Sequence, residues 1–276
     1  MKIKDYYNNL KENQRENRKS FILVTILRLI VVLAAIRNAM LGNFEVTATC
    51  VLVLLLFLVP AIMENRLKMK IPALFEGIIY LFIFAAEFLG EVNHFYVRIH
   101  GWDTMLHTMN GFLCAAIGFS LIYLLNRNHG KINLTPFYMT LMAFCFSMTV
   151  GVIWEFFECA ADQVLGADMQ KDFIVQSFQS VTLDPSGSQQ VIPVTDIIST
   201  TIHTANGDIT VNGGYLDIGI LDTMKDLFVN FIGAVVFCIM GFVYCVEEEK
   251  GKIHSRKGNF AKGMMLKVDD SKEENK

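Results

Sequence analysis

The residues "FILVTILRLIVVLAAI" (21–36) decide the class of fold, because they form a long apolar run with one charged side chain, Arg28. A helix that crosses the hydrocarbon core of a bilayer needs about 20 predominantly apolar residues. This run reaches that length by about residue 40. It therefore predicts a membrane-spanning helix.

Five further apolar runs of similar length follow along the chain. Together with the first, they cover about residues 21–40, 44–63, 71–90, 105–125, 135–158 and 226–246. Pro60, Pro72 and Pro136 fall near the ends of these runs, where a missing backbone N–H costs little. The pattern predicts an all-α polytopic membrane protein with six transmembrane helices within residues 21–246.

The composition supports this class. Residues of the AVILMFWYC set make up 53% of the 276 positions, charged residues make up 18%, and the mean hydropathy is +0.40. These values are typical of integral membrane proteins, so the expected partner is the lipid bilayer. The net charge of −3 gives no basic surface for nucleic acid. The six cysteines lie in or beside apolar runs, which favours packing roles over disulfides or a zinc site.

Lysine and arginine alternate from loop to loop. They are frequent in the N-terminal tail (1–20), in the loops after the second and fourth runs, and in the C-terminal tail (247–276), and scarce in the other loops. Basic loops face the cytoplasm. We therefore expect both termini to be cytoplasmic. The last 25 or so residues are expected to form a solvated tail.

The segment 163–221, between the fifth and sixth runs, is the longest loop and would lie outside the cell. Within it, "ANGD" (205–208) separates "TTIHT" (200–204) from "ITV" (209–211). This arrangement is typical of a β-hairpin. We expect a small β-rich extracytoplasmic insertion, and a disordered excursion is the alternative.

Polar side chains recur at helical spacing near the predicted outer ends of three spans, including "WEFFECAADQ" (154–163). Residues three or four apart share one face of a helix. The three faces carry Asp103, His107 and Asn110, then Glu155, Glu158 and Asp162, and then Asp222, Asp226 and Asn230.

Ionisable side chains are costly inside a membrane, at about 2.5–3.5 kcal/mol each near its centre. We therefore expect these residues to face a shared pocket. Carboxylates with one histidine suit Mg²⁺, Mn²⁺ or Zn²⁺. The expected ligands of such a divalent ion are Asp103, His107, Glu155, Glu158, Asp162, Asp222 and Asp226. His107 and Glu155 are also the candidate catalytic residues, Asn110, Asn230 and Glu87 would line the pocket, and Gly111, Gly151 and Gly233 would let the helices approach closely.

The residues leave other interpretations open. Asp103, Asp162 and Asp222 stand near helix ends, where aspartate also serves as a cap. Three functions compete: a metal-dependent protein that acts on an outer-leaflet lipid or glycolipid, a cation- or proton-coupled transporter, and a non-catalytic envelope protein whose acidic residues form a structural network.

Three motifs carry a family resemblance: "WDTMLHTMNGF" (102–112), "WEFFECAADQVLGADMQ" (154–170) and "LDTMKDLFVNFIGA" (221–234). The chain resembles the YjdF-type family of bacterial integral membrane proteins over about residues 70–246 and, more distantly, the VanZ-like superfamily. Glu155 and Glu158 and the long insertion before Asp222 depart from the VanZ-like pattern. The resemblance implies a compact helical fold in a bacterial cytoplasmic membrane. It implies no established reaction, since the YjdF-type family is uncharacterised.

Overall fold

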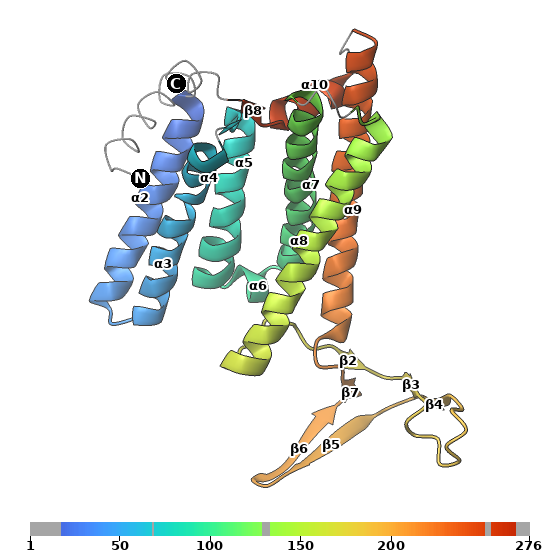
Figure 1. The fold of residues 1–276 in the computed structure, drawn as a ribbon. Coiled ribbons are helices and arrows are strands. Elements are labelled where there is room, and N and C mark those ends of the chain that lie inside the picture. Colours follow the sequence, from blue (N-terminus) through green and yellow to red (C-terminus); the bar gives the residue numbers. More distant parts are fainter. Residues whose placement is uncertain (1–17, 68, 129–132, 252–254, 269–276) are drawn as a thin grey trace. The chain divides into compact units, whose positions relative to one another are not determined.

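The structure, a computed structural model, describes residues 18–67, 69–128, 133–251 and 255–268 (Figure 1). Within these residues, six helical segments are long and apolar enough to cross a membrane, which confirms the predicted number. The segments are Ser20–Met40, Phe44–Arg66, Ala73–Val92, Trp102–Asn126, Pro136–Leu165 and Ile220–Glu249. The protein is therefore mostly helical, and it is a multi-pass membrane protein by the length and hydropathy of its helices.

The helices are α2 (Arg18–Met40), α3 (Phe44–Leu56), α4 (Val59–Leu67), α5 (Ala73–Ile83), η1 (Phe84–Val92), α6 (Phe95–Arg98), α7 (Trp102–Asn128), α8 (Pro136–Leu165), α9 (Ile220–Glu249) and α10 (Arg256–Met264). Helix α8 extends past its expected end at 158 to Leu165, and α9 begins at Ile220, before its expected start at 226.

Two of the six segments are interrupted. The second is divided into α3 and α4 at Phe57–Leu58, just before Pro60, which cannot donate a backbone hydrogen bond. The Arg28 guanidinium donates to the Phe57 carbonyl oxygen at 3.1 Å, so the only charge in the opening run binds the backbone at this break. The third segment continues from α5 into η1, a π-helix.

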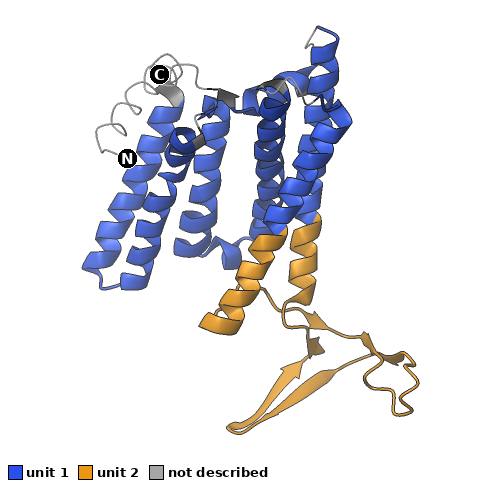
Figure 2. Cartoon of the chain, in the orientation of Figure 1, with its two compact units in different colours: residues 1–151, 229–276 blue, residues 152–228 orange. Residues whose placement is uncertain are grey.

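The chain divides into two compact units, residues 1–151 with 229–276 and residues 152–228 (Figure 2). The first unit has two hydrophobic cores. One contains side chains of α2, α3, α5 and η1, with Val31, Val53 and Phe57 fully buried. The other surrounds α7 and α9, where Phe119 and Phe237 are fully buried.

The C-terminal segment differs from the expected solvated tail. Residues 256–268 form α10 and the strand β8 (Lys267–Val268), which pairs antiparallel with β1 (Met69–Lys70) near the ends of α5 and α7 (Figure 1). Ala261, Met264, Met265 and Leu266 are buried in the core around α7 and α9. The prediction was wrong for these residues because their apolar side chains, in a segment too short to span a membrane, find partners on other helices.

The second unit holds six short strands: β2 (Ile174–Val175), β3 (Phe178–Ser180), β4 (Ile192–Val194), β5 (Ser199–Thr204), β6 (Gly207–Asn212) and β7 (Tyr215–Leu216). They form three antiparallel pairs, β2–β7, β3–β4 and β5–β6. The pair β5–β6 is the predicted hairpin, closed at Thr204 and Gly207 around a two-residue turn. The insertion is therefore built of ordered strand pairs.

Candidate functional site

Asp103 and His107 lie one turn apart on α7, in the first unit. His107 Nε2 lies 3.4 Å from Asp103 Oδ1. His107 is buried, with 8% of its surface exposed. A carboxylate beside one imidazole nitrogen orients the ring. The predicted spacing therefore gives a preorganised histidine inside a membrane-spanning helix.

The predicted pocket residues Asn110 and Asn230 contact each other where α7 meets α9. Asn110 Nδ2 donates to Asn230 Oδ1 at 3.1 Å, and Asn230 is 1% exposed. A Cβ on Gly111 would overlap with the Asn230 carbonyl oxygen, and one on Gly233 would overlap with the Thr108 carbonyl oxygen. The two helix backbones therefore touch, which confirms that these glycines allow close approach.

Helix α8 joins this contact through two further residues of the first unit. Ser147 Oγ donates to the Gly111 carbonyl oxygen at 2.7 Å. A Cβ on Gly151 would lie 2.7 Å from Asn230 Nδ2, so Gly151 makes room for the amide. Ser147 was not predicted from the sequence, because a serine in an apolar span usually bonds its own helix.

The second unit holds the acidic residues of α8. Glu155 and Glu158 are buried, at 4% and 7% exposure. Trp154 Nε1 donates to Glu158 Oε1 at 2.8 Å, so the indole orients this carboxylate. Two glutamates one turn apart on a buried helix face are therefore a second set of candidate ligands.

Asp162 and Asp222 bind the loop that follows α8. The Asp162 carboxylate accepts the backbone N–H groups of Met169 and Gln170, at 2.7 and 2.9 Å. Asp222 Oδ2 accepts the Lys171 N–H at 2.9 Å. Both were expected as metal ligands with capping as the alternative, and these contacts favour the alternative.

Lys225 is a neighbour of these carboxylates that the sequence interpretation missed. Its Nζ lies 2.6 Å from Asp222 Oδ1 and 3.5 Å from Asp226 Oδ1. Asp226 is 1% exposed, so an ammonium beside it compensates part of the cost of its burial. The spacing of Asp222 and Lys225, three residues apart on a helix, was the available signal.

Asp217 was also missed. Its carboxylate accepts the N–H groups of Phe173, Gly219 and Leu221, at 2.6, 3.3 and 2.8 Å. Burial acts to raise the pKa of Asp217, but these three backbone donors outweigh it and lower the pKa below its usual value. An aspartate just before a helix that begins at Ile220 was the available signal.

Glu87 lies in η1 and is half-buried. Among the described residues it forms no hydrogen bond or ion pair. The structure therefore gives no contact that joins Glu87 to Asn110 and Asn230, with which it was grouped.

Comparisons with known proteins agree with the fold. The chain is 24% identical over 162 residues to an uncharacterised protein of Thermotoga maritima. The aligned region covers 55% of this chain and 75% of that relative. No solved structure matches. A family described as "Predicted membrane protein (DUF2238)" matches residues 20–247, most of the chain. The protein therefore belongs to this family of predicted membrane proteins.

Proposed function

We propose that this protein binds a divalent cation through His107 of α7 and the buried carboxylates of α8 and α9, and uses it to act on the headgroup of a lipid or glycolipid in the outer leaflet of a bacterial cytoplasmic membrane. In this proposal both termini are cytoplasmic, in accordance with the basic loops. The YjdF-type and VanZ-like resemblances belong to the same proposal, since both imply a bacterial envelope protein.

The observation that carries the proposal is the burial of His107, Glu155, Glu158 and Asp226 within membrane-spanning helices. Each is at most 8% exposed. Burying ionised groups costs several kcal/mol unless opposite charge compensates them. A divalent cation supplies two positive charges, and Lys225, beside Asp222 and Asp226, supplies one.

The register of the helices also supports the proposal. Helices α8 and α9 run without a break through residues 151–152 and 228–229. In the first unit, both Asn110 and Gly151 contact Asn230. On each of the three helices, the proposed ligand lies one turn from one of these contact residues and shares its face. These ligands are His107, Glu155 and Asp226.

The residue types fit such an ion. Asp103, His107, Glu155, Glu158 and Asp226 are residues that could hold a metal ion. A mixed set of imidazole and carboxylates suits Mn²⁺ or Zn²⁺, and carboxylates alone suit Mg²⁺. When bound, the ion would polarise a phosphoryl oxygen of the headgroup. In the same proposal Asp103 orients His107, while His107 and Glu155 are the groups available to move a proton.

Metal content tests the proposal. We expect about one equivalent of a divalent ion in protein that is purified in detergent with Mg²⁺, Mn²⁺ or Zn²⁺ present, measured by inductively coupled plasma mass spectrometry. His107→Ala and Glu155→Gln should each lower it at least tenfold, since each removes a ligand.

Two matched variants control for nonspecific effects. His203→Ala removes a histidine that also lies beside an aspartate, Asp208, at 2.8 Å, but is 78% exposed. Glu76→Gln alters a glutamate that accepts a hydrogen bond from Ser20. Both should keep the ion. Absence of the ion from the wild type after all three metals are added would overturn the proposal, as would its retention in both ligand variants.

A second candidate function is non-catalytic, with the acidic residues serving as a structural network. The contacts of Asp162 and Asp222 favour it, because both carboxylates accept backbone N–H groups of the loop after α8, and Lys225 pairs with Asp222. In this case Lys225 would be the counter-ion that makes burial of Asp226 tolerable.

Lys225→Met separates the two functions. If a cation is bound, removal of a nearby positive charge should tighten its binding, by about tenfold. If the network is structural, the same variant should instead lower the melting temperature and leave metal content near zero. Isothermal titration with Mn²⁺ and thermal unfolding of the same samples measure both quantities. Asp208→Asn, on the exposed hairpin, is the control and should change neither.

A further inference from the structure

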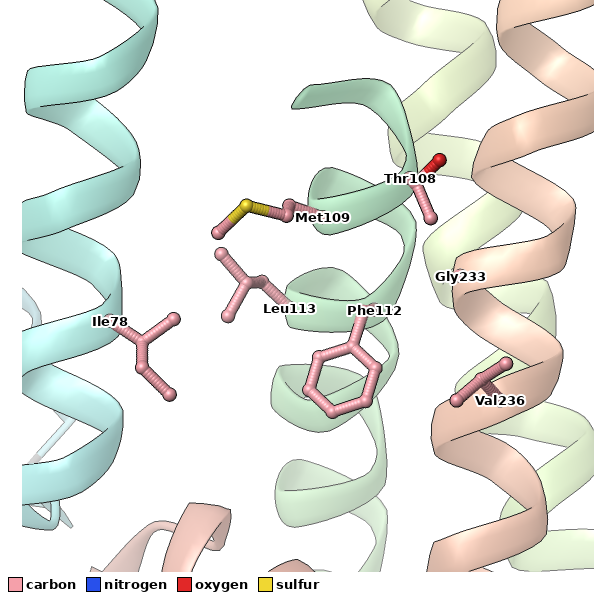
Figure 3. A pocket seen from close by; sticks show the side chains of 7 residues that line it. All are labelled: Ile78, Thr108, Met109, Phe112, Leu113, Gly233 and Val236. Carbon is pink, nitrogen blue, oxygen red and sulfur yellow. The ribbon is translucent and has the colours of Figure 1, made fainter. Parts of the chain in front are cut away.

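The first unit contains an apolar cavity of about 220 Å³ where α5, α7 and α9 meet (Figure 3). Ile78 of α5 points toward Met109 and Leu113 of α7, and Gly233 and Val236 of α9 complete the lining (Figure 3). An apolar cavity of about 150 Å³ already excludes water and accepts benzene. This larger cavity is therefore suited to hydrocarbon rather than to water or ions.

The cavity is bounded by the core that includes the C-terminal segment. The Phe112 ring, which lines the cavity, packs edge-on against Phe237 with centroids 5.2 Å apart and lies 6.4 Å from Phe260 of α10. Further along α7, Ser120 Oγ accepts the Leu266 N–H at 3.1 Å. The segment after α9 thus packs on the side of the cavity away from Asp103. A cavity that is covered on this side suits the end of a hydrocarbon chain better than it suits a channel through the protein.

The other end of the cavity begins beside the polar pair on α7. Thr108 lines the cavity and directly follows His107, which contacts Asp103. A molecule whose apolar end lay against Phe112 would have its other end near this pair. Such a molecule is amphipathic, with a linear hydrocarbon portion.

We propose that this cavity takes one acyl chain of a membrane phospholipid and thereby presents the phospholipid headgroup to His107. The proposal rests on the proposed function for the role of His107, whereas the acyl-chain site rests on the cavity alone. A membrane-spanning protein is surrounded by acyl chains, so they are the hydrocarbon available to fill the space.

Photo-crosslinking tests the site. The probe is a phosphatidylglycerol with a diazirine in one acyl chain, mixed into vesicles of phosphatidylethanolamine and phosphatidylglycerol that hold the purified protein. Mass spectrometry should locate adducts on Met109 or Leu113. Ile78→Phe fills the cavity and should lower these adducts at least fivefold. Ile232→Phe, on a 40% exposed position of α9 outside the lining, is the matched control and should leave them unchanged.

The outcomes distinguish the site from the proposed function. If wild-type adducts lie only on exposed helix faces, or if Ile78→Phe and Ile232→Phe give equal labelling, the acyl-chain site is overturned. Val236→Phe blocks the cavity from α9 and replaces Ile78→Phe should the latter fail to fold.

Metal content is measured in the same samples: cavity labelling without bound metal would retain the acyl-chain site and overturn the metal function. A polyprenyl phosphate that competes away the labelling, where unlabelled phosphatidylglycerol does not, would overturn the choice of an acyl chain.

Discussion

Gly111→Ala and Gly233→Ala should each lower the free energy of unfolding by about 3 kcal/mol, the upper end of the usual range for overpacking. The new methyl group would overlap with a backbone carbonyl oxygen on the facing helix, that of Asn230 for Gly111 and that of Thr108 for Gly233. A side chain could rotate away, but a backbone oxygen moves only with its helix. Either substitution must therefore push α7 and α9 apart.

The separation has a consequence for the double variant. Both methyl groups require the same movement of the helices. The double variant should therefore lose less unfolding free energy than the sum of the two single losses, as expected for coupled sites. Gly77→Ala is the control, because its Cβ would meet only a Leu23 side-chain atom at 3.6 Å. It should be neutral or stabilising by up to about 1 kcal/mol, the helix-propensity gain.

Thermal and denaturant unfolding in one detergent measure the stability of the wild type, the two single glycine variants, the double variant and Gly77→Ala. Gly111→Ala with the stability of Gly77→Ala would show that α7 and α9 do not touch. The same samples link the contact to function: His107 is one turn from Asn110 on α7, so we expect any divalent-ion binding to weaken in the two destabilised glycine variants and not in Gly77→Ala.

The parts of the fold that depend on local sequence could be predicted. A membrane-spanning helix is recognised from its own hydropathy, so all six segments were found. The β5–β6 hairpin was found for a similar reason, because its turn chemistry lies within four residues. The close approach of Gly111 and Gly233 followed from their places on polar helix faces.

The parts that depend on distant partners could not be predicted. Strand β2 pairs with β7, and Lys171 binds Asp222, each across a long stretch of chain. The loop contacts of Asp162 depend on where the chain turns after Leu165, which no local pattern indicates. The apolar side chains of residues 256–268 stand in a short segment interrupted by lysines, which does not signal burial, and their partners are on α7 and β1.

The same limit applies to the candidate site. Helical spacing predicted that Asp103 lies beside His107, and the structure brings the two into contact. It also placed Asn110 and Asn230 on polar helix faces that would share a pocket, and these two residues are hydrogen-bonded. Spacing could not separate a carboxylate that binds a ligand from one that binds a loop. Asp222 and Asp226 share one helix face, yet only Asp222 accepts a hydrogen bond from the Lys171 backbone. Their different surroundings are why we propose Asp226 as a ligand and Asp222 as a loop anchor.

Asp217→Ala should open the region where the insertion rejoins α9. The substitution removes the acceptor for three backbone N–H groups, those of Phe173, Gly219 and Leu221. A buried donor without a partner costs about 1–3 kcal/mol, and we expect a combined loss of about 3 kcal/mol because water will reach some of the three. Ile218, which has a positive φ of 55°, adds strain that the Asp217 contacts hold in place.

Hydrogen exchange followed by mass spectrometry measures this loss locally. Protection of residues 173–175 and 215–221 should fall at least tenfold, equivalent to about 1.4 kcal/mol, while α7 around Phe119 keeps its protection. Asp208→Ala is the control, since Asp208 lies on the exposed hairpin and pairs with an exposed histidine, His203. Equal exchange in Asp217→Ala and the wild type would contradict the anchoring role.

The pH dependence gives an independent check on the same carboxylate. Because folding lowers the pKa of Asp217, its contribution to stability is present above the unfolded pKa of about 3.9 and is lost as the pH falls through the lower, folded value. Protection factors for residues 173–175 should therefore hold from neutral pH to about pH 4 and fall below it. In Asp217→Asn they should start lower and not change over that window, because the amide does not titrate. Loss of wild-type protection well above pH 4 would mean that burial, which raises the pKa, outweighs the three hydrogen bonds. The insertion would then depend on its strand pairs and on the loop contacts of Asp162 and Asp222.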